Sequence, residues 1–164
     1  MHSYDTLLDE CNDLEIEVYE MDNMKCKGLY GDDVIWMNKS LPSIREKRCI
    51  LAEEVGHYHT TTGDILDLSS LENQKQELKA RAWAYEKLVP FSKIIQAHNL
   101  HIANRYELAD FLNVTEDFLD DALDWYKSKY GLCVSISNFT ICFEPLRVLE
   151  MFDWIETSSL QYGT

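Results

Sequence analysis

The sequence predicts an α+β fold, with a small N-terminal β-sheet packed on a central helix and with further helices and a hairpin after it. Three observations predict this arrangement. Hydrophobic and polar residues alternate in short N-terminal segments, hydrophobic residues recur at helical spacing through the middle of the chain, and the alternation returns near residue 140. The 164 residues, 46% of them hydrophobic, suit one domain with a core over residues 1–90 and an extension over residues 91–164.

The first elements are a helix and a small sheet. A helix is predicted over about residues 3–14, with its apolar side chains on one side. Residues 15–21 alternate apolar and acidic side chains, which indicates a half-exposed strand, and a hairpin is predicted around Gly31 and the two aspartates after it.

A helix is predicted next, over about residues 42–60. Its apolar residues recur at spacings of seven, four and three, which predicts a buried stripe made of Ile44, Leu51, Val55 and Tyr58. Gly56 lies within this helix and costs about 1 kcal/mol against alanine. Another backbone or a substrate is therefore expected to come close to Gly56, and simple packing against a helix of small residues is the plainer alternative.

The same helix carries the sequence E-E-V-G-H over residues 53–57. Glu53 and His57 stand at i and i+4, so both side chains can point at one ion. In the H-E-x-x-H motif the two histidines at these positions bind zinc, and the glutamate after the first histidine is the general base. Glu54 occupies the position of that base here. The alternative is a solvated helix face that bears two acids and a histidine.

A third ligand is needed, and the next helix offers Glu77. This helix is predicted over residues 74–89 and stops at Pro90. Glu77 falls on the same side as three residues that can pack, Ala80, Ala84 and Leu88. A buried carboxylate needs a metal, a cation or a hydrogen-bond donor, and Arg81 at i+4 offers an ion pair. The spacing leaves both readings open, a metal ligand and a salt bridge.

Beyond Pro90, helices are predicted over about residues 90–97, 105–112 and 116–130, followed by a hairpin around Asn138. Pro145 is expected to end that hairpin. The apolar tail is expected to dock on the core, with a partner surface as the alternative; it contains Leu146, Val148, Leu149, Met151, Phe152 and Trp154. The segment between the two central helices, residues 60–73, is expected to be a loop that borders a substrate cleft.

Charge and composition restrict the partners. The net charge of −14 disfavours phosphate backbones and anionic membranes and favours basic proteins. Residues 107–119 look like a helix-turn-helix, but the would-be reading helix is acidic, so no direct nucleic-acid binding is expected. No apolar run reaches the roughly 20 residues of a membrane span and the N-terminus does not resemble a signal peptide, so a cytoplasmic protein is expected. The five cysteines are expected to be reduced thiols.

Taken together, these motifs resemble the ImmA/IrrE family of metallo-endopeptidases. The resemblance rests on K-G-L-Y at residues 27–30, on E-E-V-G-H at residues 53–57, and on a helix pattern matched by Glu77, Ala80, Trp83, Ala84, Leu88 and Pro90. It implies a zincin-like fold, a zinc ion held by Glu53, His57 and Glu77, and Glu54 as the catalytic base. It also implies a phage or mobile-element protein that cleaves a helix-turn-helix repressor.

Glu53 departs from the family pattern, which has a histidine there. Two carboxylates and one imidazole neutralise a divalent ion formally, so the Lewis acidity of the ion should fall, and Mn²⁺ or Fe²⁺ becomes more competitive with Zn²⁺. The departure opens an alternative function, an inactive protein of the peptidase fold that acts by binding its repressor. Tyr58 and His59 follow the motif directly and are candidate auxiliary residues that could orient ligands or an oxyanion.

Overall fold

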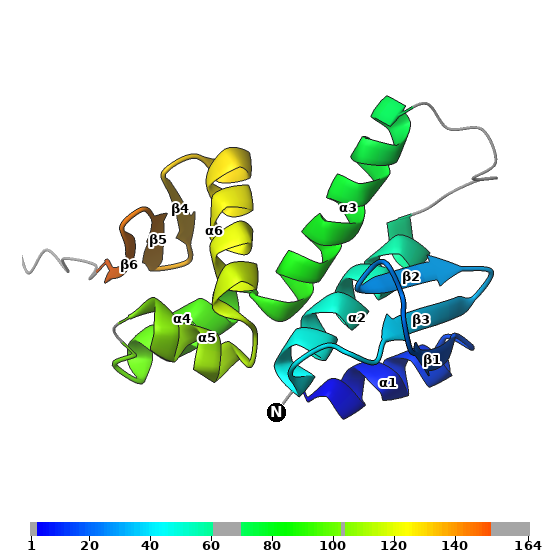
Figure 1. The fold of residues 1–164 in the computed structure, drawn as a ribbon. Helices are drawn as coiled ribbons and strands as arrows, with labels where there is room; N and C mark the ends of the chain where they lie inside the picture. The colour runs from blue at the N-terminus through cyan, green and yellow to red at the C-terminus, as the bar shows by residue number, and fades with distance from the viewer. Residues whose placement is uncertain (1–2, 61–69, 103, 152–164) are drawn as a thin grey trace, which may run out of the picture.

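The computed structural model describes residues 3–60, 70–102 and 104–151 and confirms the α+β fold (Figure 1). The first half contains, in chain order, α1 (Tyr4–Asp13), β1 (Glu17–Met21), β2 (Gly28–Gly31), β3 (Val34–Asn38), α2 (Ile44–Thr60) and α3 (Ser70–Leu88). The second half contains α4 (Phe91–Asn99), α5 (Arg105–Leu112), α6 (Glu116–Tyr130), β4 (Cys133–Ile136), β5 (Phe139–Phe143) and β6 (Leu146–Glu150).

The first sheet has the strand order β1-β3-β2, with β1 parallel and β2 antiparallel to β3. Ile35 and Met37 of the central strand β3 are fully buried, because alternate residues of β3 face the helices. Asp32 and Asp33 join β2 to β3 with positive φ angles of 50° and 59°. This is the backbone of a tight hairpin turn, so the hairpin predicted around Gly31 is confirmed.

Helices α2 and α3 pack closely against each other, and Gly56 is the point of contact. A Cβ atom added at Gly56 would lie 2.3 Å from the carbonyl oxygen of Ala80. The expectation that another backbone comes close to Gly56 is thus confirmed. Leu51 and Val55 are fully buried as predicted, but Ile44 is 65% exposed. That prediction was wrong because Ile44 is the first residue of α2 and lies beyond the covered part of the helix.

Helix α3 begins at Ser70, four residues before the predicted start at residue 74, and ends at Leu88, two residues before Pro90. The earlier turn escaped prediction because its exposed polar residues, such as Glu72 and Asn73, show no apolar periodicity. Residues 60 and 70–73 of the predicted loop are thus helical, and the rest of it, residues 61–69, lies outside the part of the chain that the structure describes.

The second sheet has the order β4-β5-β6 and is antiparallel throughout. The predicted hairpin of β4 and β5 is confirmed, and β5 ends at Phe143, just before Pro145, as expected, but a third strand that was not predicted follows. The chain turns at Pro145 and pairs back on β5 as β6. Leu146 and Val148 of β6 pack against the core, as docking of the tail requires, whereas Leu149 and Met151 are 52% and 64% exposed. The tail residues Phe152 and Trp154 lie outside the described residues.

Two cysteines are paired. Cys133 and Cys142 form a disulfide between β4 and β5, whereas Cys11 and Cys49 are buried free thiols and Cys26 is an exposed one. The expectation of five reduced thiols was therefore wrong for one pair. The reason is the register of the hairpin, which places Cys133 directly opposite Cys142, and sequence spacing alone does not reveal this.

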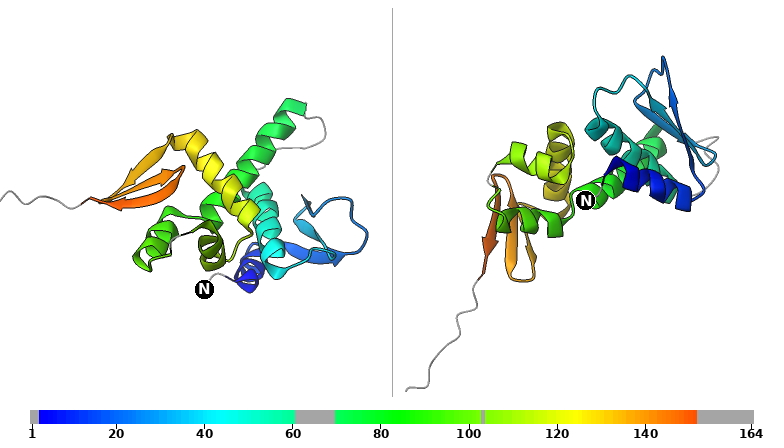
Figure 2. Two further views of the ribbon diagram at one scale, coloured as in Figure 1. Left: turned by 60° about the vertical axis from the view of Figure 1, so that its left-hand side comes forward. Right: turned by 90° about the horizontal axis from the view of Figure 1, so that it is seen from below.

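The two sheets lie at opposite ends of the molecule, with α3 and α6 between them (Figure 2). Buried residues of both halves belong to one hydrophobic cluster. Arg48 of α2 is buried and donates hydrogen bonds from Nη1 to the carbonyl oxygens of Leu112 and Asn113, at 2.9 and 2.7 Å. Across the described ranges, no helix combines the length and the apolar character that crossing a bilayer requires.

Candidate functional site

A cavity of about 480 Å³ lies among β2, α2 and α3. Every residue predicted to hold a metal or to act as the base lines it: Glu53, Glu54, His57 and Glu77. The same wall includes Gly28, Leu29 and Tyr30 from β2 and Arg81 from α3. The structure therefore brings the two predicted motifs together at one cavity.

Glu54 is the most deeply placed acid of the cavity, with only 8% of its surface exposed. Gly28 leaves room for it, because a Cβ atom there would lie 2.6 Å from Glu54 Oε1. Burial, with smaller contributions from the charges of Glu53 and Glu77, raises the pKa of Glu54 to about 8, although the backbone N–H of Tyr30, which donates to the carboxylate, acts in the opposite direction. Glu54 can therefore exchange a proton near neutral pH.

Glu53 lies one residue earlier on α2 and is partly buried. Burial raises its pKa to about 7, and the guanidinium of Arg81 is the strongest opposing influence. The electrostatic effect of Arg81 on Glu53 indicates that the guanidinium reaches across from α3 toward the acids of α2.

His57 and Glu77 meet across the two helices. His57 Nε2 lies 3.2 Å from Glu77 Oε2. Two ligands about 2.1 Å from one tetrahedral ion lie roughly 3.4 Å apart, so the observed separation suits a shared divalent ion. Burial lowers the pKa of His57, although the charge of Glu77 acts in the opposite direction. A lowered pKa favours neutral imidazole, which is the form that binds metals.

Glu77 has a second partner. Arg81 Nε donates to Glu77 Oε1 at 2.8 Å, one helical turn further along α3. The Glu77 side chain is 44% exposed, so the inward carboxylate predicted from its helix face is in fact at the rim of the cavity. The spacing left a metal ligand and an ion pair as alternatives, and the structure shows the ion pair with Arg81 while the other carboxylate oxygen faces His57.

The donor types of this cluster suit a divalent ion, since imidazole and carboxylate are ligands of zinc, manganese and iron. The spacing of His57 and Glu77 suits one as well. Within residues 3–60, 70–102 and 104–151, however, no three His, Cys, Asp or Glu side chains are grouped so that together they could hold an ion. His57 and Glu77 are thus assembled as a pair, and Glu53 lines the same cavity as a third donor.

Tyr58 and His59, the candidate auxiliary residues, form ring contacts beside the cavity. Tyr58 packs edge-on against Tyr30, with ring centroids 6.1 Å apart. His59 is exposed and stacks on Trp83 of α3 at 4.7 Å. Neither residue lines the cavity, since Tyr58 packs toward β2 and His59 packs on α3.

Two site residues, Gly28 and Tyr30, had no role assigned from the sequence, whereas Arg81 was considered only as an ion-pair partner of Glu77. Gly28 and Tyr30 support Glu54, and Arg81 joins the acidic cluster. A glycine in a strand beside a tyrosine is a signal that another group approaches the backbone, so the sequence did hold a hint of Gly28. Sequence spacing alone could not show that Arg81 reaches both α2 and α3 acids.

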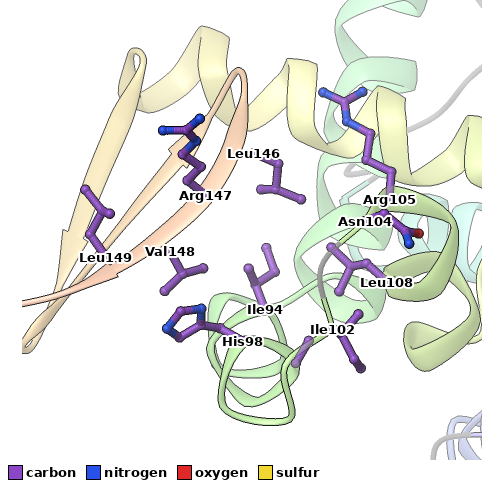
Figure 3. Close-up of a pocket in the computed structure, with 11 residues that line it drawn as sticks. Ile94, His98, Ile102, Asn104, Arg105, Leu108, Leu146, Arg147, Val148 and Leu149 are labelled. Atoms are coloured by element: carbon purple, nitrogen blue, oxygen red, sulfur yellow. The ribbon is translucent and has the colours of Figure 1, made fainter.

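A second cavity, of about 380 Å³, lies between α4–α5 and β6 (Figure 3). Its wall is apolar at Ile94, Leu146 and Val148, and it carries the cationic or titratable side chains of His98, Arg105 and Arg147. No carboxylate lines it, and it contains none of the predicted site residues. It is therefore a separate feature of the second half of the molecule.

Comparison with known proteins agrees with the geometry. No curated protein matches the chain significantly. A family model does match, the IrrE N-terminal-like domain of peptidase family M78, over residues 11–124. That range includes both helices of the cavity and the sheet beside it. Because the match extends over more than half of the 164 residues, this chain belongs to the IrrE N-terminal-like family of M78 peptidases.

Proposed function

We propose that this chain is a metal-dependent endopeptidase, of phage or mobile-element origin, that inactivates a helix-turn-helix repressor by cleavage. Glu53, His57 and Glu77 are the residues that would hold the ion, and Glu54 is the general base. Zinc is the first candidate, with Mn²⁺ or Fe²⁺ as competitors because of the second carboxylate. A divalent ion bound there supplies Lewis acidity toward a peptide carbonyl.

One observation carries the proposal, the contact between His57 Nε2 and Glu77 Oε2 at 3.2 Å. The two side chains come from different helices, 20 positions apart in the sequence, so local helix geometry does not bring them together. The contact depends on the close α2–α3 packing at Gly56. A site that brings an imidazole and a carboxylate together in this way favours metal binding.

Glu54 supports the catalytic part of the proposal. Its pKa of about 8 suits a group that takes a proton from a nucleophile and later returns it to a leaving amine near neutral pH. The Tyr30 N–H and the space left by Gly28 hold its carboxylate at the wall of the cavity. Positioning of this kind is what a general base requires.

The sheet beside the cavity supports a polypeptide ligand. Strand β2 is at the edge of the sheet, and its residues Gly28, Leu29 and Tyr30 line the cavity. An edge strand can pair with an extended peptide through backbone hydrogen bonds. The net charge of −14 favours a basic partner, and DNA-binding repressors are locally basic.

A second function is favoured by one observation, the ion pair of Arg81 with Glu77. If Arg81 permanently replaces the ion, the chain inactivates its repressor by binding without cleavage. Glu53 in place of a histidine favours the same outcome. This alternative keeps the same partner and the same edge strand.

Co-expression with a small repressor encoded beside this chain's gene tests both functions. The wild type is compared with Glu54→Gln and His57→Ala, and Asp124→Asn serves as a control that removes an exposed acid of α6. Peptidase activity predicts repressor fragments and derepression with the wild type and the control only. Derepression that survives Glu54→Gln and His57→Ala, with an intact repressor, would establish the binding function instead. Intact repressor without derepression in every strain would refute both.

A further inference from the structure

Arg81 and His57 share one carboxylate. Glu77 Oε1 accepts a hydrogen bond from Arg81 Nε at 2.8 Å, while Glu77 Oε2 faces His57 Nε2 at 3.2 Å. Each oxygen of Glu77 therefore has a partner. The oxygen that faces His57 is positioned for an ion, and the other is bound to a guanidinium.

The charges around the cavity make Arg81 the relevant cation. Its wall has three carboxylates, from Glu53, Glu54 and Glu77, and two cationic side chains, from Lys27 and Arg81. Lys27 is 66% exposed and pairs with Glu46 at 2.8 Å, and its charge acts on Glu53 more weakly than that of Arg81 does. Arg81 is attracted by Glu53 as well as by Glu77. A guanidinium keeps its proton in proteins, so this positive charge is permanent.

We propose that Arg81 is a built-in competitor of the metal ion, so that its guanidinium and a divalent cation bind the Glu53–His57–Glu77 cluster in mutually exclusive states. This inference rests on the metal site of the proposed function. It adds that Arg81 sets the affinity of that site for the divalent ion. A divalent ion beside a guanidinium would meet strong like-charge repulsion. Metal binding therefore requires Arg81 to leave Glu77, and this requirement lowers the apparent affinity.

The competition explains why the described residues show a pair of donors and no assembled group of three. The acids of α2 and α3 are drawn to a planar, extended cation, whose geometry differs from the convergent geometry around a single ion. Removing the guanidinium should leave Glu53 and Glu77 without their neutralising partner. A divalent ion would then be the strongest available partner for them.

Metal titration of the purified full chain tests the inference without any measurement of activity. Chelator-treated protein is titrated with Zn²⁺ and separately with Mn²⁺, by calorimetry and by competition with a chelating dye. Arg81→Met removes the charge and keeps an aliphatic chain, and Arg81→Gln is a second neutral variant in case the first does not fold. Because the Arg81 side chain is 46% exposed, both variants should fold.

Two further variants separate charge from other effects. Arg81→Lys keeps a positive charge at the same position. Arg105→Met is the matched control, because Arg105 is 44% exposed and pairs with Asp120 at 2.5 Å, far from this cavity. A double variant, Arg81→Met with His57→Ala, tests whether any gained metal binds at the predicted cluster.

The inference predicts that the neutral Arg81 variants bind one equivalent of metal about 10- to 100-fold more tightly than the wild type. Arg81→Lys and Arg105→Met should resemble the wild type, and the double variant should lose the gain. Tight binding by the wild type with no gain in the Arg81 variants would overturn the inference and leave the metal site standing. No metal bound by the wild type or by either neutral variant would refute the metal site itself, and the inference with it.

Discussion

Glu54 shows how a single carboxylate acquires its properties from its neighbours. It is almost fully buried, it is next to Glu53, and a backbone N–H from Tyr30 compensates this burial in part. Burial of a charge without a cation favours the protonated acid. The pKa of Glu54 is raised as a consequence. Burial of this carboxyl group suits a general base, but it lowers the free energy of unfolding at high pH, where the group is charged.

Replacing Glu54 with glutamine should therefore stabilise the metal-free protein in a pH-dependent way. A glutamate with a folded-state pKa of about 8, against an ordinary value of 4.5, binds more protons in the folded state between these two values. The stability of the wild type thus falls as pH rises through this window. Urea unfolding with chelator present should show Glu54→Gln to be more stable by about 1–2 kcal/mol at pH 8, and by much less at pH 5. Equal effects at both pH values would contradict the burial argument.

Glu53 sets the charge of the proposed metal site. Glu53→His replaces a carboxylate with an imidazole and restores one net positive charge to a bound zinc site. We expect the ratio of Zn²⁺ affinity to Mn²⁺ affinity to be at least about 10-fold higher in this variant than in the wild type, because nitrogen donors favour zinc. Competition between the two ions, measured by dialysis and elemental analysis, checks this. An unchanged ratio would mean that Glu53 does not contact the ion.

For single residues, the sequence predicted which side chains lie near one another better than it predicted which of them form hydrogen bonds or ion pairs. Glu53, Glu54, His57 and Glu77, which the motif spacing grouped, line one cavity. It could not show that Arg81 would bind Glu77, because an i, i+4 pair forms or not according to what the neighbouring helix offers. The role of the four residues as a metal site stays a prediction.

Helices α2 and α3 are the elements that create the site, and Gly56 determines how closely they approach. An added Cβ would meet the Ala80 carbonyl oxygen at 2.3 Å, and a backbone atom cannot move aside as the end of a flexible side chain can. The intrinsic helix preference for alanine over glycine, about 1 kcal/mol, is therefore outweighed by the clash.

Gly56→Ala should lower the free energy of unfolding by about 2–4 kcal/mol, because the helices must separate to accommodate the methyl group. Gly31→Ala is the control, since a Cβ there meets only Trp36 Cζ3 at an ordinary 3.8 Å, and it should change stability by less than about 0.5 kcal/mol. Urea denaturation of both variants provides the comparison. A neutral or stabilising Gly56→Ala would show that α2 and α3 lie further apart than described.

Helices α5 and α6 were predicted to the residue. Asn104 and Thr115 cap α5 and α6 through their side chains, and both helices span the predicted ranges. The start of α3 and strand β6 were missed for opposite reasons. The first turns of α3 are polar and exposed, whereas β6 follows a proline, Pro145, that forms a turn between two paired strands.

Across the whole molecule, Arg48 connects the two halves. It is 2% exposed, and its Nη1 donates to the carbonyl oxygens of Leu112 and Asn113 at the end of α5. Burial lowers its pKa. A buried guanidinium of this kind is stabilised only if its hydrogen bonds persist, so the halves are held in one arrangement by these two bonds.

Arg48→Met should lower the free energy of unfolding by about 3 kcal/mol, because the buried carbonyl group of Leu112 and the partly buried one of Asn113 lose their donor. Arg45→Met provides a matched control on the same helix. Arg45 pairs with Asp110 at 2.6 Å but is 37% exposed, so its loss should cost less than about 1 kcal/mol. Denaturant unfolding monitored by tryptophan fluorescence measures both. Similar costs for the two variants would contradict a structural role for Arg48.

The overall architecture was predictable because the pattern of apolar residues is strong in most elements. The sequence did not predict the parallel pairing of β1 with β3 or the disulfide of Cys133 with Cys142, since both depend on which strands become neighbours. The single-domain organisation and the absence of nucleic-acid binding stay predictions.

We propose that the Glu53–His57–Glu77 cluster binds one cation at a time, either Arg81 or a divalent ion. Anomalous diffraction from crystals of the Arg81→Met variant soaked in Zn²⁺ or Mn²⁺ tests it most directly. We expect a single strong anomalous peak, from one bound ion, in contact with His57 Nε2 and a Glu77 oxygen, with Glu53 turned toward it. Crystals that show no anomalous peak in this cavity, or a peak that touches neither His57 nor Glu77, would contradict it.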